Sequence, residues 1–402
     1  MSSDIKFEVL KKNSSVNFKL NELGKVSKID GVSPPSVFIG SKLKYPEMNV
    51  GILSPLQREE EAWIYDDAKF WAKNNLAIEE VIALRGGLLN SRFKGHALSP
   101  RLTDRFTLIA QEIAIASKPV DVEIELKNKI DLDKKPDRVL TQHGFSAGLK
   151  SAKVVSNVKV NQKVDKVIND EIKASEGIKF LYKNNFDEYT LSKILSVGVL
   201  GLKKNKKFVP TRWSITATDD SIGKDILERV RQYKWIENHE LFYGEFLGNQ
   251  YLLLLFPGVF SYELFELYVP GSSWNPSTEM KASTDYEDFY GRKEYAFNCA
   301  GGYYASRLPI LEYLDSIKRQ ASVLVIRIET PSYWAALGVW VVRESVRKAL
   351  QKRMTFASRE ELLDGAKQIS KIKYKYDNSG ILAKSKLLSQ IKTQKKLGEF
   401  GI

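Results

Sequence analysis

The stretch that decides the fold is Leu241-Phe-Tyr-Gly-Glu-Phe-Leu-Gly248-Asn249-Gln-Tyr251-Leu-Leu-Leu-Leu-Phe256. Residues 251–256 form an apolar run that is strand-sized and far shorter than the roughly 20 residues of a membrane span. Gly248-Asn249 separates two apolar segments, which is typical of a tight turn, so the stretch predicts a β-hairpin. A second run of Val, Leu and Ile at residues 322–328 predicts another buried strand.

Helical patterns lie on both sides of these strands along the chain. Apolar residues recur at helical spacing in residues 58–74, 103–117, 164–182 and 300–319. Residues 120–126 alternate Val-Asp-Val-Glu-Ile-Glu-Leu, which predicts a half-exposed strand. Because strand and helix patterns interleave, we expect a mixed α/β (α+β) fold, with a large globular body of mixed sheet and helices.

The composition places the chain among soluble globular proteins and argues against several kinds of site. The 402 residues are 43% hydrophobic and 28% charged, and residues 1–10 lack the apolar core of a signal peptide. We therefore expect a cytoplasmic protein with no membrane partner. The single cysteine, Cys299, excludes an intramolecular disulfide and a thiolate-rich zinc site, and the three histidines are scattered without ligand spacing, so we expect no zinc. A Mg²⁺ or Mn²⁺ ion bound by carboxylates remains open.

The charge of the chain favours a polyanionic partner. Lysine and arginine exceed aspartate and glutamate by 62 − 49 = 13 residues, and the net charge is +13. Such an excess of one sign is typical of proteins that bind nucleic acid. The alternative is a lysine-rich surface of the kind found in thermophilic proteins.

Two glycine-bearing segments are candidates for binding phosphate. Residues 84–96 contain Arg85, Arg92 and Lys94 and lack acidic residues, which predicts a loop whose cations and backbone N–H groups hold phosphates. The alternative is a flexible basic loop without a ligand. At residues 301–307, a Gly-Gly pair opens a helix with Arg307 one turn further on, which predicts another anion site; tight helix packing explains the glycines equally well.

The polar stretch at residues 203–221 is the densest in the body of the chain. It begins with four lysines, Lys203, Lys204, Lys206 and Lys207. Arg212 and Trp213 follow, for which we predict phosphate contact and base stacking. Asp219 and Asp220 then precede a helix predicted for residues 221–233. They are candidate ligands of a divalent metal, with Arg212 as a catalytic partner, or they cap that helix.

The last residues of the chain carry a short apolar motif. Gln394, Leu397 and Phe400 are spaced by three, which places Leu397 and Phe400 on one face of a short helical turn. The pattern resembles the peptide by which replication and repair proteins bind the sliding clamp PCNA. The usual pattern ends in two aromatic residues, whereas Gly401 occupies the second place here. The alternative is that this segment folds back on its own domain.

Several blocks together resemble the archaeal Nre family of DNA repair proteins. They are Pro34-Pro-Ser-Val-Phe-Ile-Gly40, Glu112-Ile-Ala-Ile-Ala-Ser-Lys-Pro-Val-Asp121, Val209-Pro-Thr-Arg-Trp-Ser-Ile-Thr216 with Asp219-Asp220, Gly301-Gly-Tyr-Tyr304, Arg319-Gln-Ala-Ser322, Trp334 and Gly338-Val-Trp340. The resemblance implies a role in repairing DNA damage and a C-terminal peptide that binds PCNA. Many family members begin with a four-cysteine, zinc-finger-like segment, which this sequence lacks.

These observations predict a domain plan and a function. We expect a loosely held segment at residues 1–30, an N-terminal Nre-like region at 31–290, a C-terminal Nre-like region at 291–370 and a flexible basic tail at 371–402. The predicted function is a DNA-binding repair protein that its tail recruits to PCNA. The alternative is a metal-dependent nuclease or other DNA-modifying enzyme centred on Arg212, Asp219 and Asp220, and RNA is a third candidate partner.

Overall fold

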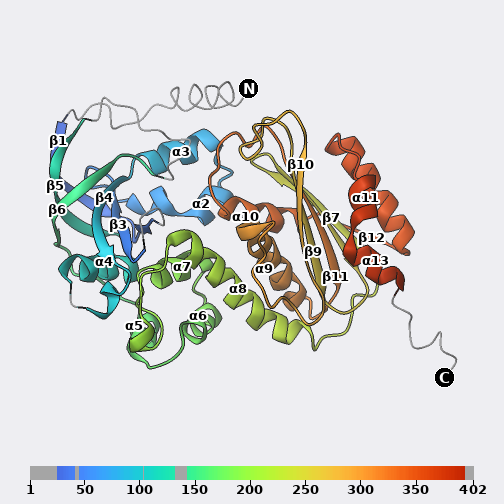
Figure 1. Cartoon of the computed structure of the whole chain (residues 1–402), viewed down its shortest axis with the longest axis horizontal. Coiled ribbons are helices and arrows are strands. Elements are labelled where there is room, and N and C mark those ends of the chain that lie inside the picture. Colours follow the sequence, from blue (N-terminus) through green and yellow to red (C-terminus); the bar gives the residue numbers. More distant parts are fainter. Residues whose placement is uncertain (1–24, 41–44, 103, 132–142, 394–402) are drawn as a thin grey trace. The chain divides into compact units, whose positions relative to one another are not determined.

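The computed structural model describes residues 25–40, 45–102, 104–131 and 143–393 (Figure 1). The described residues divide into two compact units, which we call the N-terminal unit (residues 25–222) and the C-terminal unit (residues 223–393). Each unit contains its own mixed sheet and its own helices, which confirms the mixed α/β class. Within the described ranges, we find no helix that is both long and apolar enough to cross a membrane.

The N-terminal unit contains a six-stranded sheet of order β1-β5-β6-β4-β3-β2. Its strands are β1 (Lys25–Ser33), β2 (Val37–Ile39), β3 (Glu47–Ser54), β4 (Leu89–His96), β5 (Val120–Asp131) and β6 (Ser146–Val154). Neighbouring strands are antiparallel except β4 and β6, which are parallel. The Ser33 hydroxyl at the end of β1 donates to the Leu53 carbonyl on β3 at 2.6 Å, so two strands that are not neighbours in the sheet order come close at this point. Residues 1–24 of the segment predicted to be loosely held lie outside the described residues, and strand β1 occupies the rest.

The other regular elements that begin in the N-terminal unit are helices. They are η2 (Ala62–Asp66), α2 (Ala68–Lys73), α3 (Ile78–Gly86), η3 (Ser99–Arg101), α4 (Arg105–Ile115), α5 (Gln162–Asn169), α6 (Ala174–Lys183), α7 (Glu188–Ser196), η4 (Lys203–Asn205) and α8 (Thr211–Val230). Helix α4 packs on the sheet through Phe106, whose ring lies 5.4 Å from that of Phe93 on β4. Helix α8 continues past Ile222 into the C-terminal unit.

The C-terminal unit is built on the predicted buried strands. Its sheet has the order β10-β9-β11-β8-β7-β12, and β11 is parallel to β9. The strands are β7 (His239–Phe246), β8 (Asn249–Phe256), β9 (Ser261–Tyr268), β10 (Lys281–Glu287), β11 (Ser322–Glu329) and β12 (Arg353–Phe356). Strands β7 and β8 confirm the hairpin, and its turn residues are Leu247 and Gly248, which both have positive φ. Every residue of β8 and β11 is buried, because helices cover both faces of the sheet.

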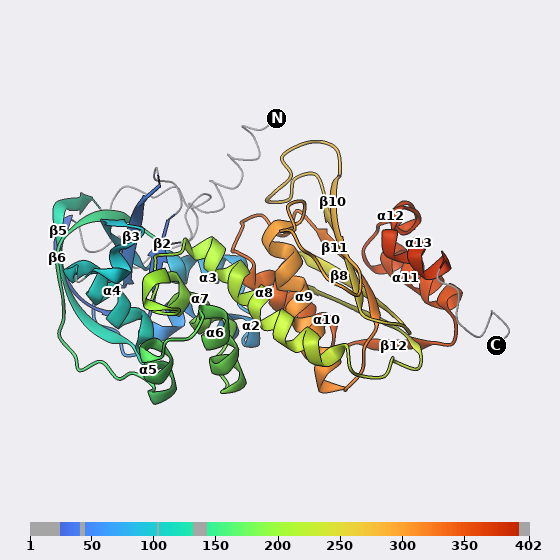
Figure 2. The same cartoon turned by 60° about the horizontal axis from the view of Figure 1, so that its bottom comes forward.

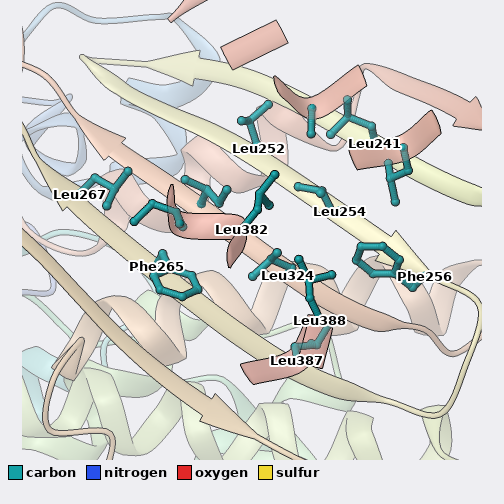
Figure 3. Packing of buried hydrophobic residues seen from close by; sticks show 14 of the residues in the cluster. Leu241, Leu252, Leu254, Phe256, Phe265, Leu267, Leu324, Leu382, Leu387 and Leu388 are labelled. Carbon is teal, nitrogen blue, oxygen red and sulfur yellow. The ribbon is translucent and has the colours of Figure 1, made fainter. Parts of the chain in front are cut away.

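Helices lie on both faces of this sheet (Figure 2). Helices α9 (Ala300–Ser316) and α10 (Trp340–Ala349) form the first layer, and α11 (Arg359–Lys373), α12 (Ser379–Lys384) and α13 (Lys386–Thr393) form the second. Figure 3 shows the core under the second layer, where Leu382, Leu387 and Leu388 pack against strand residues such as Leu254 and Leu324.

This packing corrects the prediction of a flexible basic tail from residue 371. The chain from Lys371 to Thr393 completes α11 and forms α12 and α13. Four apolar residues of this lysine-rich segment are buried in the core: Ile381, Leu382, Leu387 and Leu388. Lysine side chains on the opposite side of a short helix stay in water without preventing this burial. Only residues 394–402 of the predicted tail lie outside the described residues.

Two further expectations were wrong in their local structure. The predicted loop at residues 84–96 is the end of α3 followed by strand β4. The helix predicted to begin at Ser221 begins at Thr211, directly after Pro210. Asp219 and Asp220 therefore lie in the interior of α8, so they do not cap it.

Candidate nucleic-acid interface

Strand β4 presents two of the predicted cations to solvent. Arg92 and Lys94 are exposed. Phe93, which lies between them, and Gly95, which follows Lys94, are buried. Successive side chains of a strand point to opposite faces, so Arg92 and Lys94 share the solvent face of the sheet. The Lys94 ammonium lies 4.0 Å from the Glu47 carboxylate, and both side chains are largely exposed. Such a loose surface pair leaves Lys94 available to other anions.

Two neighbouring strands extend this positive surface. Gly148 on β6 pairs with Arg92, and the stem of Lys127 on β5 would contact a Cβ placed at Gly148 at 3.3 Å. The absence of a side chain at Gly148 thus leaves room for the stem of Lys127 over the position that pairs with Arg92. Lys150 on β6 is exposed too and forms a 2.9 Å ion pair with Glu125. We call Arg92, Lys94, Lys127 and Lys150 the basic strip.

The predicted lysine cluster meets β4 at its far end. The Phe208 N–H donates to the Ala97 carbonyl at 2.9 Å, and the Arg101 guanidinium donates to the Lys206 carbonyl at 2.8 Å. These bonds hold the chain after β4 beside the chain that carries Lys203, Lys204 and Lys207, which are all exposed. Basic residues more than a hundred positions apart therefore lie along one end of the sheet.

Lys206 differs from the other three lysines of the cluster. Its ammonium group donates to the Ile168 carbonyl at 2.8 Å, and burial lowers its pKa below the ordinary value. This side chain is engaged within the protein, whereas Lys203, Lys204 and Lys207 are directed to solvent.

The first turn of α8 holds an exposed aromatic ring next to a cation. Trp213 is 55% exposed, and the Arg212 guanidinium lies 5.6 Å from the centre of its ring. The turn is anchored by Thr211, whose hydroxyl accepts from the Ile39 N–H at 2.9 Å. Arg212 and Trp213 therefore project from a fixed point of the N-terminal unit. An exposed indole with an adjacent guanidinium suits base stacking and phosphate contact.

Arg85 is engaged inside the N-terminal unit. Its guanidinium lies 3.3 Å from the Asp66 carboxylate, and the Lys193 ammonium approaches the same carboxylate at 2.9 Å. Burial raises the pKa of Asp66, but Lys193, Arg85 and a hydrogen bond from Ser36 outweigh it and keep this pKa below its ordinary value. Arg85 thus helps to neutralise a half-buried acid, and the structure does not group it with the basic strip.

His143 is a buried residue whose ring is affected by the charges of both Arg85 and Arg92. Its Nε2 atom is 2.9 Å from the Asn90 amide nitrogen, and its ring is buried. Burial, together with the charges of Arg85 and Arg92, lowers the pKa of His143 to about 4. The ring is therefore neutral at pH 7 and accepts the Asn90 hydrogen bond. Sequence reasoning missed Asp66, Lys193 and His143, because no local motif marks them.

Two predicted site residues on α8 point in different directions. Asp219 is buried and Asp220 is half-buried, and both interact with other groups. Consecutive residues of an α-helix diverge by about 100°, so the two carboxylates do not converge on one ion. In the described ranges, no group of three or more His, Cys, Asp or Glu side chains is arranged to hold a metal.

Arg307 does not form an anion site at the start of α9. It is 3% exposed, and its Nη1 atom donates to both carboxylate oxygens of Glu287 at 2.9 and 2.8 Å. Gly302 has a packing role, because a Cβ at this position would lie 2.3 Å from the Glu266 carboxylate. The predicted PCNA-binding residues Gln394, Leu397 and Phe400 lie outside the described residues.

Comparison with known proteins defines the class to which the chain belongs. Residues 3–275 match the family model described as Archaeal Nre, N-terminal, and residues 287–400 match the model described as Archaeal Nre, C-terminal. The chain therefore belongs to the archaeal Nre family. The two family models meet between residues 275 and 287, whereas the compact units of the structure meet at Ile222 and Gly223.

Three curated relatives match most of the chain. A protein of Haloferax volcanii named DNA repair protein NreA is 40% identical over 81% of this chain and 79% of its own length. A protein of the same name from Archaeoglobus fulgidus is 40% identical over 86% of both chains. The DNA repair protein NreB of Archaeoglobus fulgidus is 33% identical over 85% of this chain and 87% of its own. No solved structure matches the chain.

Proposed function

We propose that this chain is a DNA repair protein that binds DNA through the basic strip and the lysine cluster and is recruited to the sliding clamp PCNA by its C-terminal peptide. The names of three relatives that each cover most of the chain support the role in repair. The observation that carries the DNA contact is the exposure of Arg92 and Lys94 together on β4, with Lys127 beside them.

The exposed cations suit contact with the DNA backbone. Phosphate contacts by lysine and arginine release counterions, and each contact contributes about 0.7 to 0.9 to the slope of log affinity against log salt. Point contacts of this kind bind DNA without reading its sequence. Trp213 adds a ring on which an unpaired base can stack. We therefore expect weak, salt-dependent binding with little sequence preference.

A charge-removal experiment tests the DNA contact. We expect Arg92→Ala/Lys94→Ala to weaken binding and to reduce the salt slope by about 1.5, because two phosphate contacts are lost. Lys69→Ala/Lys73→Ala is a matched control that removes two exposed charges from α2. Fluorescence anisotropy at several salt concentrations measures both. An unchanged slope in the β4 variant would show that the basic strip does not contact DNA.

The fold supports tail recruitment by fixing the point from which the tail departs. Buried Glu263 on β9 accepts hydrogen bonds from the backbone N–H groups of Lys386 and Leu387, each at 3.0 Å. The Ser385 hydroxyl donates to the same carboxylate at 2.5 Å. Helix α13 is thereby fixed to the sheet and ends at Thr393, one residue before Gln394. Nine residues follow Thr393, and they reach at most about 32 Å.

Calorimetry with purified PCNA tests the recruitment. We expect the full chain to bind in the micromolar range, about −8 kcal/mol, and Leu397→Ala/Phe400→Ala to abolish the heat of binding. Glu399→Ala is the matched control, because it changes the tail outside the motif. If the double variant binds PCNA as the full chain does, the tail is not the recruiting element.

A further inference from the structure

The loop between β10 and α9 carries three exposed aromatic rings. Tyr290 is 87% exposed, Phe297 is 75% exposed and Tyr295 is 39% exposed. We call Tyr290, Tyr295 and Phe297 the aromatic loop. All three belong to the C-terminal unit, and none of them is used by the DNA contact proposed above.

The loop is held in shape by polar contacts beneath the rings. The Arg292 guanidinium donates to the carbonyls of Tyr286 at 2.9 Å and Tyr295 at 3.0 Å. It also pairs with the buried Asp285 carboxylate at 3.1 Å, and that carboxylate accepts from the Cys299 N–H at 2.8 Å. Buried hydrogen-bonded pairs of this kind fix the loop backbone while the rings remain in water.

The rings also support one another. The Tyr295 ring is stacked on the buried Tyr304 ring, with centroids 5.4 Å apart, and meets the Phe297 ring edge-on at 5.3 Å. Tyr304 also holds the loop backbone, since its hydroxyl accepts from the Ala296 N–H at 3.0 Å. The exposed rings are thus supported by the buried Tyr304 ring. This support reduces the conformational entropy that the exposed side chains lose when a flat ligand binds.

The charges around the rings indicate what kind of ligand fits. Lys293 and Glu294 are exposed directly between Tyr290 and Tyr295, and the Arg231 guanidinium lies 5.2 Å from the Phe289 ring. The cores of protein–protein interfaces are depleted of charged residues, because both partners must desolvate them. A base stacked on an exposed ring leaves adjacent charges in water, and Lys293 and Arg231 can then face the phosphates.

We propose that the aromatic loop stacks unpaired bases of single-stranded DNA. This inference rests on the proposed DNA-binding function and adds to it a preference for DNA with unpaired bases. The basic strip contacts phosphates of any DNA, whereas the aromatic loop distinguishes single strands from duplex, because bases in a duplex are already stacked on each other.

Anisotropy with an oligo-dT strand and with a duplex of equal length tests the loop. We expect Tyr290→Ala/Phe297→Ala to weaken binding of the single strand by about tenfold to a hundredfold, as loss of one or two stacked bases does, and to leave duplex binding unchanged. Tyr290→Trp/Phe297→Tyr keeps flat rings and should bind the single strand as the unaltered chain does. Ile372→Ala removes an apolar side chain that is 65% exposed on α11 and is the matched control.

The outcomes separate this inference from the function on which it rests. Unaltered binding of oligo-dT by Tyr290→Ala/Phe297→Ala overturns the aromatic loop as a base contact. An equal loss of single-strand and duplex binding overturns it as well, because the loop would then not distinguish unpaired bases. If the unaltered chain binds neither DNA, the proposed function itself fails. Duplex binding by the variant also reports that the protein remains folded.

Discussion

At the scale of single residues, position 302 requires glycine because the Glu266 carboxylate lies directly against it. The Glu266 carboxylate accepts from Arg327 at 2.5 Å and from the Tyr268 hydroxyl at 2.8 Å, so it has no room to move. A Cβ on Gly302 would lie 2.3 Å from that carboxylate, far inside van der Waals contact. The glycine pair that the sequence suggested as an anion site is thus a place where a helix approaches a buried ion pair.

A matched pair of glycine substitutions tests this role. We expect Gly302→Ala to lower the free energy of unfolding by about 2 kcal/mol, because overpacking displaces the buried carboxylate. Gly380→Ala lies in helix α12 with no atom within 4 Å of the added Cβ and should raise the free energy of unfolding by about 0.5 kcal/mol. Urea denaturation measures both. Equal effects of the two substitutions would contradict the packing role.

His143 makes the stability of the N-terminal unit depend on pH. Its pKa is about 4 in the fold and 6.5 in an unfolded chain. The unfolded state binds more protons between these values, so stability is lost as the pH falls from about 6.5 to 4. The loss amounts to at most about 3 kcal/mol. We expect His143→Gln, which does not titrate, to flatten this part of the profile.

Urea denaturation between pH 4.5 and 7.5 measures the effect of His143. The carboxylates that titrate at low pH are common to both proteins, so the difference between the two profiles isolates the histidine. If that difference does not change with pH across the window, His143 is not held neutral.

Arg85 and Arg307 are predicted site residues that form ion pairs within the protein instead. They show why residue type alone did not identify the site. Arg92, Arg85 and Arg307 look equally cationic in the sequence. Arg85 is paired with an acid 19 residues away and Arg307 with one 20 residues away, and these partners become visible only in the folded chain. Arg92 alternates with a buried phenylalanine on β4, and this alternation was present in the sequence.

At the scale of elements, apolar runs predicted the structure well and charged segments predicted it poorly. Strand β11 and the β7–β8 hairpin follow from continuous apolar stretches, because a sheet covered on both faces requires them. Helices α12 and α13 were missed, because the six lysines at residues 371–392 hide the four apolar residues that fix the two helices to the sheet. Their position also depends on Glu263, which is more than a hundred residues earlier in the chain.

Glu263 provides a test of how α13 is held. We expect Glu263→Gln to lower the free energy of local opening of α13 by about 2 kcal/mol, because an amide cannot accept all three hydrogen bonds. Hydrogen exchange of the Lys386 and Leu387 amides measures this opening. Glu360→Gln on α11 changes an exposed carboxylate and should have an effect below about 0.5 kcal/mol. Unchanged exchange in Glu263→Gln would show that α13 is held by apolar packing alone.

At the scale of the whole molecule, the segment that connects the folded body to the C-terminal motif is shorter in the structure than the sequence predicted. The sequence predicted a tail of about thirty residues, whereas helix α13 remains on the sheet as far as Thr393. A short connection raises the effective concentration of the body near a clamp-bound DNA. Under the proposed function, we therefore expect weak DNA binding by the basic strip and weak clamp binding by the tail to suffice together for stable attachment.

Inserting residues after Thr393 tests the length of this connection. We expect a flexible insertion of about 40 glycine and serine residues to leave binding of free PCNA unchanged but to weaken binding to clamp-loaded DNA, because the effective concentration falls with linker length. Calorimetry and anisotropy measure the two affinities. If both are unchanged, the short connection has no role.

The central claim is that the tail and the basic strip act together on DNA that carries the clamp. Its most direct test is the affinity of the chain for closed circular DNA with and without loaded PCNA, compared with that of Leu397→Ala/Phe400→Ala. We predict binding at least about tenfold tighter when PCNA is loaded, and loss of this gain in the double variant. Equal affinity for bare and clamp-loaded DNA, or a gain that persists in the variant, would contradict the claim.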